Sequence, residues 1–166
     1  MTFKKATNTD AEKVWQILQE AIAMRKADGS NQWQDGYPNP ETITNDIELS
    51  NGYVLMENQL IIAYAAVIFD IEPAYENIEG KWLSNGPYVV VHRVAVTTEA
   101  KGRGIATIIM KKIEDLALSK NVGSIKVDTN FDNVQMLKIL DKLGYTYCGQ
   151  VYFRGSPRRA FEKLLM

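Results

Sequence analysis

The chain has 166 residues, a length that fits one domain with a real hydrophobic core. Hydrophobic residues make up 46% and charged residues 23%, ordinary values for a soluble globular protein, and the net charge is −1. The balanced charge argues against a non-specific nucleic-acid binder, and the lone Cys148 excludes a disulfide framework and a cysteine-only zinc cluster. We expect no nucleic-acid partner and no metal. A single cysteine suits a reducing, cytoplasmic location. The sequence shows no apolar run of membrane-spanning length and no signal peptide, so we expect no membrane partner.

The first half of the chain predicts a strand, two helices and a hairpin. Thr9 and Glu12 have the spacing of a capping box, and the helix that follows places Val14, Ile17 and Leu18 on one face. Pro40 suits the first turn of the second helix. The expected elements are a strand over 3–7, a helix from about 9 to 28, a short helix over 40–49, and strands over 53–56 and 60–69.

The second half alternates strands and helices after an irregular segment. The β-branched run before His92 is typical of a strand in the middle of a sheet, and from Gly104 the apolar period changes from two to about 3.6. The expected elements are an irregular segment over 70–87, a strand over 88–96, a helix from 104 through 116, a strand over 124–128, a helix over 133–143, and strands over 145–152 and 160–165. This order predicts one α/β domain over residues 1–166, with a central mixed sheet of about seven strands flanked by about four helices.

The junction Lys101-Gly102-Arg103-Gly104 joins a strand to a helix through two glycines and two cations. A helix start has unpaired N–H groups and a partial positive charge, so a di- or polyphosphate can bind there, and glycine allows its close approach. The alternative is a tight turn with ordinary surface cations. A Walker loop is absent, and a dinucleotide fingerprint lacks its third glycine because Thr107 stands there.

Two segments resemble the GNAT superfamily of N-acetyltransferases. HRVAVTTEAKGRGIAT, residues 92–107, is similar to motif A, an apolar strand, a short loop and Q/R-x-x-G-x-G/A opening a helix, with Lys101 at the first position. NVQMLKILDKLGY, residues 133–145, is similar to the second cofactor segment of the family. The resemblance covers essentially the whole chain, although the first half matches only in element order.

The resemblance implies a GNAT-like domain that binds acetyl-CoA as co-substrate and transfers its acetyl group, by direct attack, to a primary amine of a small molecule or peptide. It implies that Val94, Ala95 and Val96 offer backbone groups to the pantetheine arm, and that Asn133 binds this arm from the other side. The residues implied for the pyrophosphate are Gly102, Arg103, Gly104, Ile105, Ala106 and Thr107.

The sequence departs from the family pattern at one position, and this departure leaves other functions open. Many relatives carry, four residues before the glycine that closes the second cofactor helix, a tyrosine that protonates the thiolate; here that position is Leu140. A non-catalytic acyl-CoA-binding or regulatory module is therefore an alternative, and a nucleotide-phosphate binder unrelated to acyl transfer is a third.

His92 and Asp128 are the candidate general bases. An imidazole titrates near neutrality, and arylalkylamine N-acetyltransferases resemble this strand and place a catalytic histidine at the position of His92. Alternation would put Val90, His92, Val94 and Val96 on one face. Ribosomal-protein alanine N-acetyltransferases look similar and have a glutamate base where Asp128 stands. The alternatives are a buried, hydrogen-bonded histidine and a carboxylate that caps a turn; Asp70 and Glu72 are weaker candidates.

The acceptor is poorly specified by the sequence. Trp33, Tyr37 and Trp82 can line a pocket or pack loops, and three late arginines can bind a carboxylate or lie in a solvated turn. Those arginines are Arg154, Arg158 and Arg159. Cys148 reads as a small core residue rather than a nucleophile, because nothing adjacent would activate it. A homodimer is left open.

Overall fold

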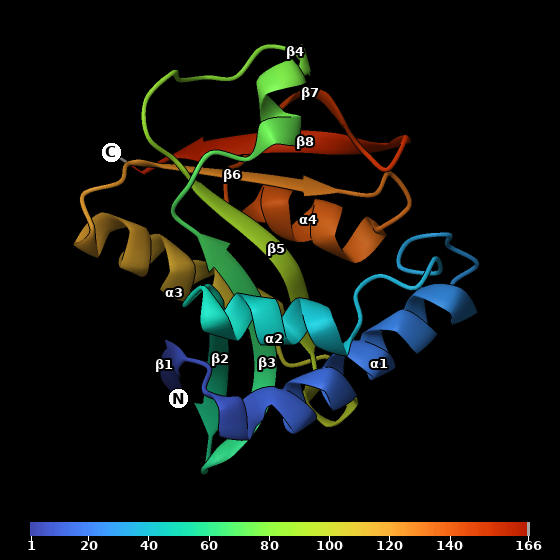
Figure 1. The fold of residues 1–166 in the computed structure, drawn as a ribbon. Helices are drawn as coiled ribbons and strands as arrows, with labels where there is room; N and C mark the ends of the chain where they lie inside the picture. The colour runs from blue at the N-terminus through green and yellow to red at the C-terminus, as the bar shows by residue number, and fades with distance from the viewer. Residues whose placement is uncertain (166) are drawn as a thin grey trace. The chain divides into compact units, whose positions relative to one another are not determined.

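The computed structural model describes residues 1–165, and the chain divides into two compact units. The first unit contains residues 1–67 and 93–110; the second contains residues 68–92 and continues from residue 111. Figure 1 shows the elements of both along the chain. One long strand passes from the second unit into the first between His92 and Arg93.

The described residues form eight strands and four α-helices, in the predicted order with one short strand added. The strands are β1 (Thr2–Lys5), β2 (Gly52–Glu57), β3 (Leu60–Ile68), β4 (Glu79–Gly80), β5 (Val89–Val96), β6 (Ser124–Thr129), β7 (Thr146–Phe153) and β8 (Ser156–Leu164). The α-helices are α1 (Ala11–Ala27), α2 (Pro40–Glu48), α3 (Ile105–Ser119) and α4 (Val134–Lys142). The strands make one mixed sheet in the order β1-β2-β3-β5-β6-β8-β7-β4. The predicted α/β class is confirmed.

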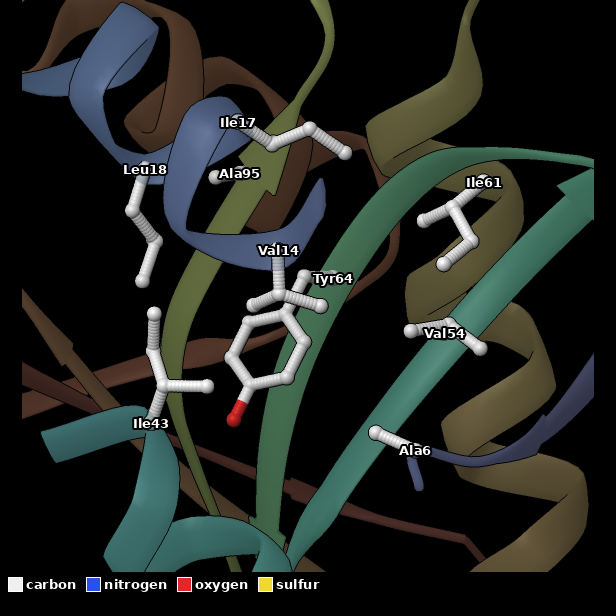
Figure 2. Packing of buried hydrophobic residues seen from close by; sticks show 9 residues of the cluster. All are labelled: Ala6, Val14, Ile17, Leu18, Ile43, Val54, Ile61, Tyr64 and Ala95. Carbon is white, nitrogen blue, oxygen red and sulfur yellow. The ribbon is translucent and has the colours of Figure 1, made fainter. Parts of the chain in front are cut away.

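The first unit packs α1 and α2 against β2 and β3. Val14, Ile17 and Leu18 repeat at helical spacing along α1 and are fully buried. Figure 2 shows them in one cluster with Tyr64 of β3 and Ile43 of α2. Apolar burial of this kind contributes about 1.5–3 kcal/mol for each large side chain. This core is therefore what holds the two helices on this half of the sheet.

The start of α1 differs from the prediction. The expected capping box of Thr9 and Glu12 is wrong, because Thr9 lies inside a short 3₁₀ turn over Asn8–Asp10 that precedes the helix. The reciprocal pair instead joins Thr7 and Asp10, with the Thr7 amide donating to Asp10 Oδ2 at 2.8 Å. The cap sits two residues earlier because Asp10, like Glu12, stands three residues after a threonine.

The second unit orders its strands around β6. β5 pairs with β6 in parallel, with Val90 opposite Lys126, whereas β6 and β8 pair antiparallel, as do β7 and β8. Val90 and Val151 form a buried cluster with Tyr75, a residue of the 3₁₀ helix η2 (Pro73–Asn77). The segment predicted as irregular thus contributes both η2 and β4 to this unit.

Arg93 interrupts the regular geometry of β5. Its φ is +57°, a left-handed conformation that is uncommon for a non-glycine residue and is typical of a bulge. The predicted common face of Val90, His92, Val94 and Val96 assumed unbroken alternation, and that alternation does not continue through Arg93. Within the first unit, Arg93 instead points its guanidinium at Asp46 of α2.

Gly149→Ala is expected to destabilise the second unit by roughly 2–4 kcal/mol. Gly149 and Gly80 face each other where β7 pairs with β4, and a Cβ on Gly149 would lie 2.2 Å from the Glu79 carbonyl oxygen. The φ of Gly149, +143°, also disfavours any side chain. Urea unfolding measures the effect, with Gly86→Ala as control because nothing lies within 4 Å of a Cβ there. Equal midpoints for the two variants would contradict this packing.

Candidate functional site

The glycine turn before α3 leaves room for a ligand. Gly102 and Gly104 have φ of +80° and +72°, and no atom lies within 4 Å of a Cβ built on either glycine. The amide of Ile108 donates to the Gly104 carbonyl at 3.1 Å, so the amides before Ile108 belong to the open first turn of the helix. Unpaired helix-start amides beside open space suit a phosphate group. The turn therefore fits the pyrophosphate that the sequence predicted for it.

The two cations of this turn already contact protein groups. Arg103 donates through Nη2 to both carboxylate oxygens of Glu57, at 2.8 and 2.9 Å, in a partly exposed ion pair. Lys101 Nζ lies 3.1 Å from Met24 Sδ, and burial lowers the pKa of the Lys101 ammonium. An exposed ion pair is worth only about 0–1 kcal/mol, so an anion can displace Glu57 at little cost. The backbone amides are therefore the fixed part of the turn.

Glu20 of α1 anchors the loop that leads into the turn. Its Oε1 accepts from the Thr98 amide at 3.0 Å and from Thr97 Oγ1 at 3.2 Å. Burial acts to raise the pKa of Glu20, but the hydrogen bonds from Thr98 and Thr97 outweigh it and lower this pKa. Sequence reasoning missed Glu20, because it is 78 residues away from Thr98 and no local pattern joins them.

The predicted pantetheine triplet lies on β5 within the first unit. Ala95 is 4% exposed and packs in the core with residues of α1, while Val94 and Val96 are half-buried. Ala95 thus has a structural role through its side chain. The expected role of the three backbones in binding the cofactor stays a prediction.

His92 and Asp128, the two candidate bases, lie together in the second unit. His92 Nδ1 is 3.7 Å from Asp128 Oδ1, and both side chains are mostly buried. Tyr75 donates its hydroxyl to the same Oδ1 at 2.6 Å. Burial, the largest effect, raises the pKa of Asp128 to about 6, against the lowering effects of the Tyr75 hydrogen bond and the Arg158 charge. Two residues that the sequence offered as alternatives are thus neighbours.

Aromatic side chains surround this pair. The Tyr75 and Phe153 rings each approach the His92 ring edge-on, at centroid distances of 6.2 and 5.7 Å. Trp82 donates its indole N–H to the Tyr75 carbonyl at 2.9 Å, and the Lys126 ammonium lies over the Trp82 ring. Trp82 therefore packs the irregular segment, one of the two uses that the sequence left open. This enclosure buries Asp128, and burial raises the pKa of its carboxyl.

Asn133 caps α4. Its side-chain oxygen accepts from the Met136 amide at 3.3 Å, which satisfies one free amide at the helix start. Leu140, at the position where many relatives carry a tyrosine, is fully buried in α4. The hydroxyl that would protonate a thiolate from that position is therefore missing, as the sequence indicated.

The other singled-out residues have mainly packing roles. Trp33 packs against the core of the first unit, and Tyr37 accepts a hydrogen bond from Arg93. Cys148 is buried, and burial raises the pKa of its thiol, which opposes a nucleophilic role. Arg158 is 9% exposed and donates to Asn130 Oδ1, so its alternative place in a solvated turn is wrong.

A buried ion pair in the first unit gave no sequence signal. Arg93 donates through Nε and Nη2 to Asp46 at 3.0 and 2.6 Å, and the Tyr64 hydroxyl donates to Asp46 Oδ2 at 2.6 Å. Burial and the negative charge of Asp46 raise the pKa of Tyr64, so Tyr64 stays a neutral donor. The pair joins α2 to β5 just after His92 in the chain, and only the fold brings these residues together.

Asp128→Asn is expected to make the protein more stable at neutral pH. The native carboxyl, with a pKa of about 6, binds a proton more tightly than an ordinary carboxyl of pKa 3.8. Its stabilising contribution is present at low pH and is lost as pH rises through about 6. Above that pH the free energy of unfolding of the variant should exceed that of the wild type by roughly 1–3 kcal/mol. Urea unfolding at pH 4 and pH 7.5 measures this, and an equal difference at both pH values would contradict it.

Comparisons with known proteins agree on the family. The model of the GNAT acetyltransferase family matches residues 14–145. A GNAT-family acetyltransferase of Streptococcus agalactiae is 36% identical, with a TM-score of 0.90 over 98% of this chain and 94% of that one. No curated protein matches the chain significantly.

More distant structures share the fold. An acetyltransferase of Salmonella typhimurium, solved with its cofactor acetyl-CoA, is 16% identical, with a TM-score of 0.71 over 100% of this chain and 94% of that one. A ribosomal-protein-alanine N-acetyltransferase of Brucella melitensis is 16% identical, with a TM-score of 0.72 over 99% and 100%. Within residues 1–165, no helix has the length and hydropathy needed to cross a membrane. The chain belongs to the GNAT family of acetyltransferases, enzymes that depend on acetyl-CoA.

Proposed function

We propose that this enzyme transfers the acetyl group of acetyl-CoA to a primary amine of a small molecule or peptide, by direct attack of the amine. The observation that carries the proposal is the pair of His92 and Asp128, 3.7 Å apart in a buried setting. Membership of the family supports the donor and the amine class of acceptor.

The glycine turn is the proposed phosphate site. The amides from Gly102 to Thr107 would bind the pyrophosphate, and the space above both glycines is free of protein atoms within 4 Å. Arg103 would exchange Glu57 for a phosphate oxygen. The backbones of Val94, Ala95 and Val96 and the side-chain amide of Asn133 are the proposed contacts of the pantetheine arm. When bound, acetyl-CoA supplies an activated thioester carbonyl.

His92 is the proposed general base. An attacking amine must lose a proton, and an imidazole can take it near neutral pH. The carboxylate of Asp128 would orient His92 through Nδ1 and stabilise the imidazolium that forms, with Nε2 as the proposed proton acceptor. The separation of 3.7 Å exceeds a hydrogen bond, and such contacts often shorten only when substrates are bound. With Leu140 in place of the usual tyrosine, water is the proposed proton source for the sulfur.

Two measurements test the function. Calorimetry with acetyl-CoA should detect binding, and the absence of binding at high micromolar concentration would end the proposal. Release of the CoA thiol is then followed with an amine panel of an aromatic monoamine, a polyamine, an amino acid and a peptide with a free N-terminus. The acetylated product is identified by mass spectrometry. Binding without thiol release from any amine would favour the non-catalytic acyl-CoA-binding module instead.

A further inference from the structure

Tyr75 is a buried polar group in direct contact with the proposed base pair, and the mechanism has not used it. Its hydroxyl donates to Asp128 Oδ1 at 2.6 Å, the same oxygen that faces His92 Nδ1. A short hydrogen bond from a neutral hydroxyl to a carboxylate is among the stronger ones in proteins. Sequence reasoning did not single out Tyr75, because it lies 53 residues before Asp128 in an irregular segment.

Tyr75 is held in place independently of Asp128. It lies in η2, and its carbonyl accepts the indole N–H of Trp82 at 2.9 Å. Its ring packs against the rings of Trp82, Tyr88 and Phe153 at centroid distances between 5.2 and 6.4 Å. The side chain is 1% exposed. A hydroxyl on so rigid a ring can fix the carboxylate rather than follow it.

We propose that Tyr75 is a positioning residue for acetyl transfer, which orients the Asp128 carboxylate and keeps it charged so that His92 is held for proton transfer. The inference rests on the proposed function. Tyr75 itself stays a neutral donor, because burial and the nearby charge of Asp128 raise its pKa well above the ordinary value. It therefore acts through Asp128 and transfers no proton.

The charged and titratable groups around Asp128 determine how its pKa should change when the Tyr75 hydroxyl is removed. Tyr75 from η2 and Arg158 from β8 lower the pKa of Asp128, whereas burial and Glu72, just before η2, raise it. His92 from β5 faces the same oxygen. Without the Tyr75 hydroxyl, the pKa of Asp128 should rise above about 6. The carboxylate would then be lost at a higher pH.

Tyr75→Phe tests the proposal because it removes the hydroxyl and keeps the ring. With acetyl-CoA and the most active amine of the panel, kcat should fall roughly tenfold, and the acidic limb of the pH–rate profile should move up by about one pH unit. The KM for acetyl-CoA should change little. Tyr88→Phe is the matched control, since its hydroxyl belongs to the same cluster but accepts from the Glu72 amide instead. The control should keep the wild-type acidic limb.

Two further variants separate positioning from packing. In an Asp128→Asn background, Tyr75→Phe should cause no further loss of kcat, because the carboxylate through which it acts is gone. With 3-fluorotyrosine at position 75, a stronger donor, the acidic limb should move down. Suppose the wild type is active but the acidic limb of the pH–rate profile does not move in Tyr75→Phe, or the double variant loses kcat by the full additional factor. Either result would overturn the inference about Tyr75 and leave the proposed function standing. A wild type that acetylates no amine would overturn the proposed function and this inference with it.

Discussion

His92→Ala is expected to lower kcat by roughly 10²–10⁴-fold, while the affinity for acetyl-CoA changes little. The imidazole is the proposed proton acceptor, and it lies on the part of β5 that precedes the predicted pantetheine triplet in the chain. Asp128→Asn should lower kcat by a smaller factor, about tenfold to a hundredfold, because the amide can still contact His92 Nδ1 but stabilises no imidazolium. Steady-state release of the CoA thiol between pH 5.5 and 9 measures both effects.

The control for these variants is Asp70→Asn. Asp70 is exposed and its carboxylate accepts from the adjacent Ile71 amide at 2.8 Å, so its loss should leave kcat within about twofold. Asp70 was also a weaker candidate base on sequence grounds, so the control tests that alternative directly. Full rates for both His92→Ala and Asp128→Asn across this pH range would show that the base lies elsewhere.

Gly104→Glu is expected to weaken acetyl-CoA binding by at least about a hundredfold while the fold survives. The new side chain would enter the space that is free of atoms within 4 Å, where the pyrophosphate is proposed to sit, and would add a negative charge there. The φ of +72° adds backbone strain, which costs about 1 kcal/mol for a non-glycine residue. Calorimetry measures the affinity, and urea unfolding measures the stability.

Gly155→Glu is the matched control for the strain. Gly155 lies in the β7–β8 turn with a φ of +76° and equally open surroundings, so its replacement should cost similar stability and leave the affinity unchanged. If Gly104→Glu retained wild-type affinity, the turn would not be the phosphate site. If both variants lost affinity equally, the effect would come from destabilisation rather than from the turn.

Local patterns predicted most of the elements because each pattern has its cause nearby in the chain. The apolar spacing of Val14, Ile17 and Leu18 indicated α1, and these residues are buried as expected. The strand that becomes β5 and the helix that becomes α3 were found within a residue or two at their starts. The capping box was misplaced because Thr7–Asp10 and Thr9–Glu12 have the same spacing, and spacing alone cannot choose between them. The two-residue strand β4 was missed because only its pairing with β7 defines it.

The candidate site was predicted in part. The open glycine turn follows from the position of Gly102 and Gly104 at a strand–helix junction, where backbone conformation is a local matter. His92 and Asp128 were each found as candidates, but their pairing was not, since 36 residues separate them in the chain. Even longer separations hid the contacts of Glu20 with Thr98, Tyr75 with Asp128 and Asp46 with Arg93, which span 78, 53 and 47 residues.

The sequence by itself determined the family, the order of the main elements and the position of the open glycine turn, because these depend on short-range spacing and backbone preference. Only the tertiary structure decided which buried groups meet: Arg93 with Asp46, and Tyr75 and His92 with Asp128. It also decided the protonation of Asp128, whose pKa of about 6 comes from burial that no local pattern records. Burial and long-range pairing are properties of the folded chain. They are what place the carboxylate of Asp128 beside His92, the proposed general base.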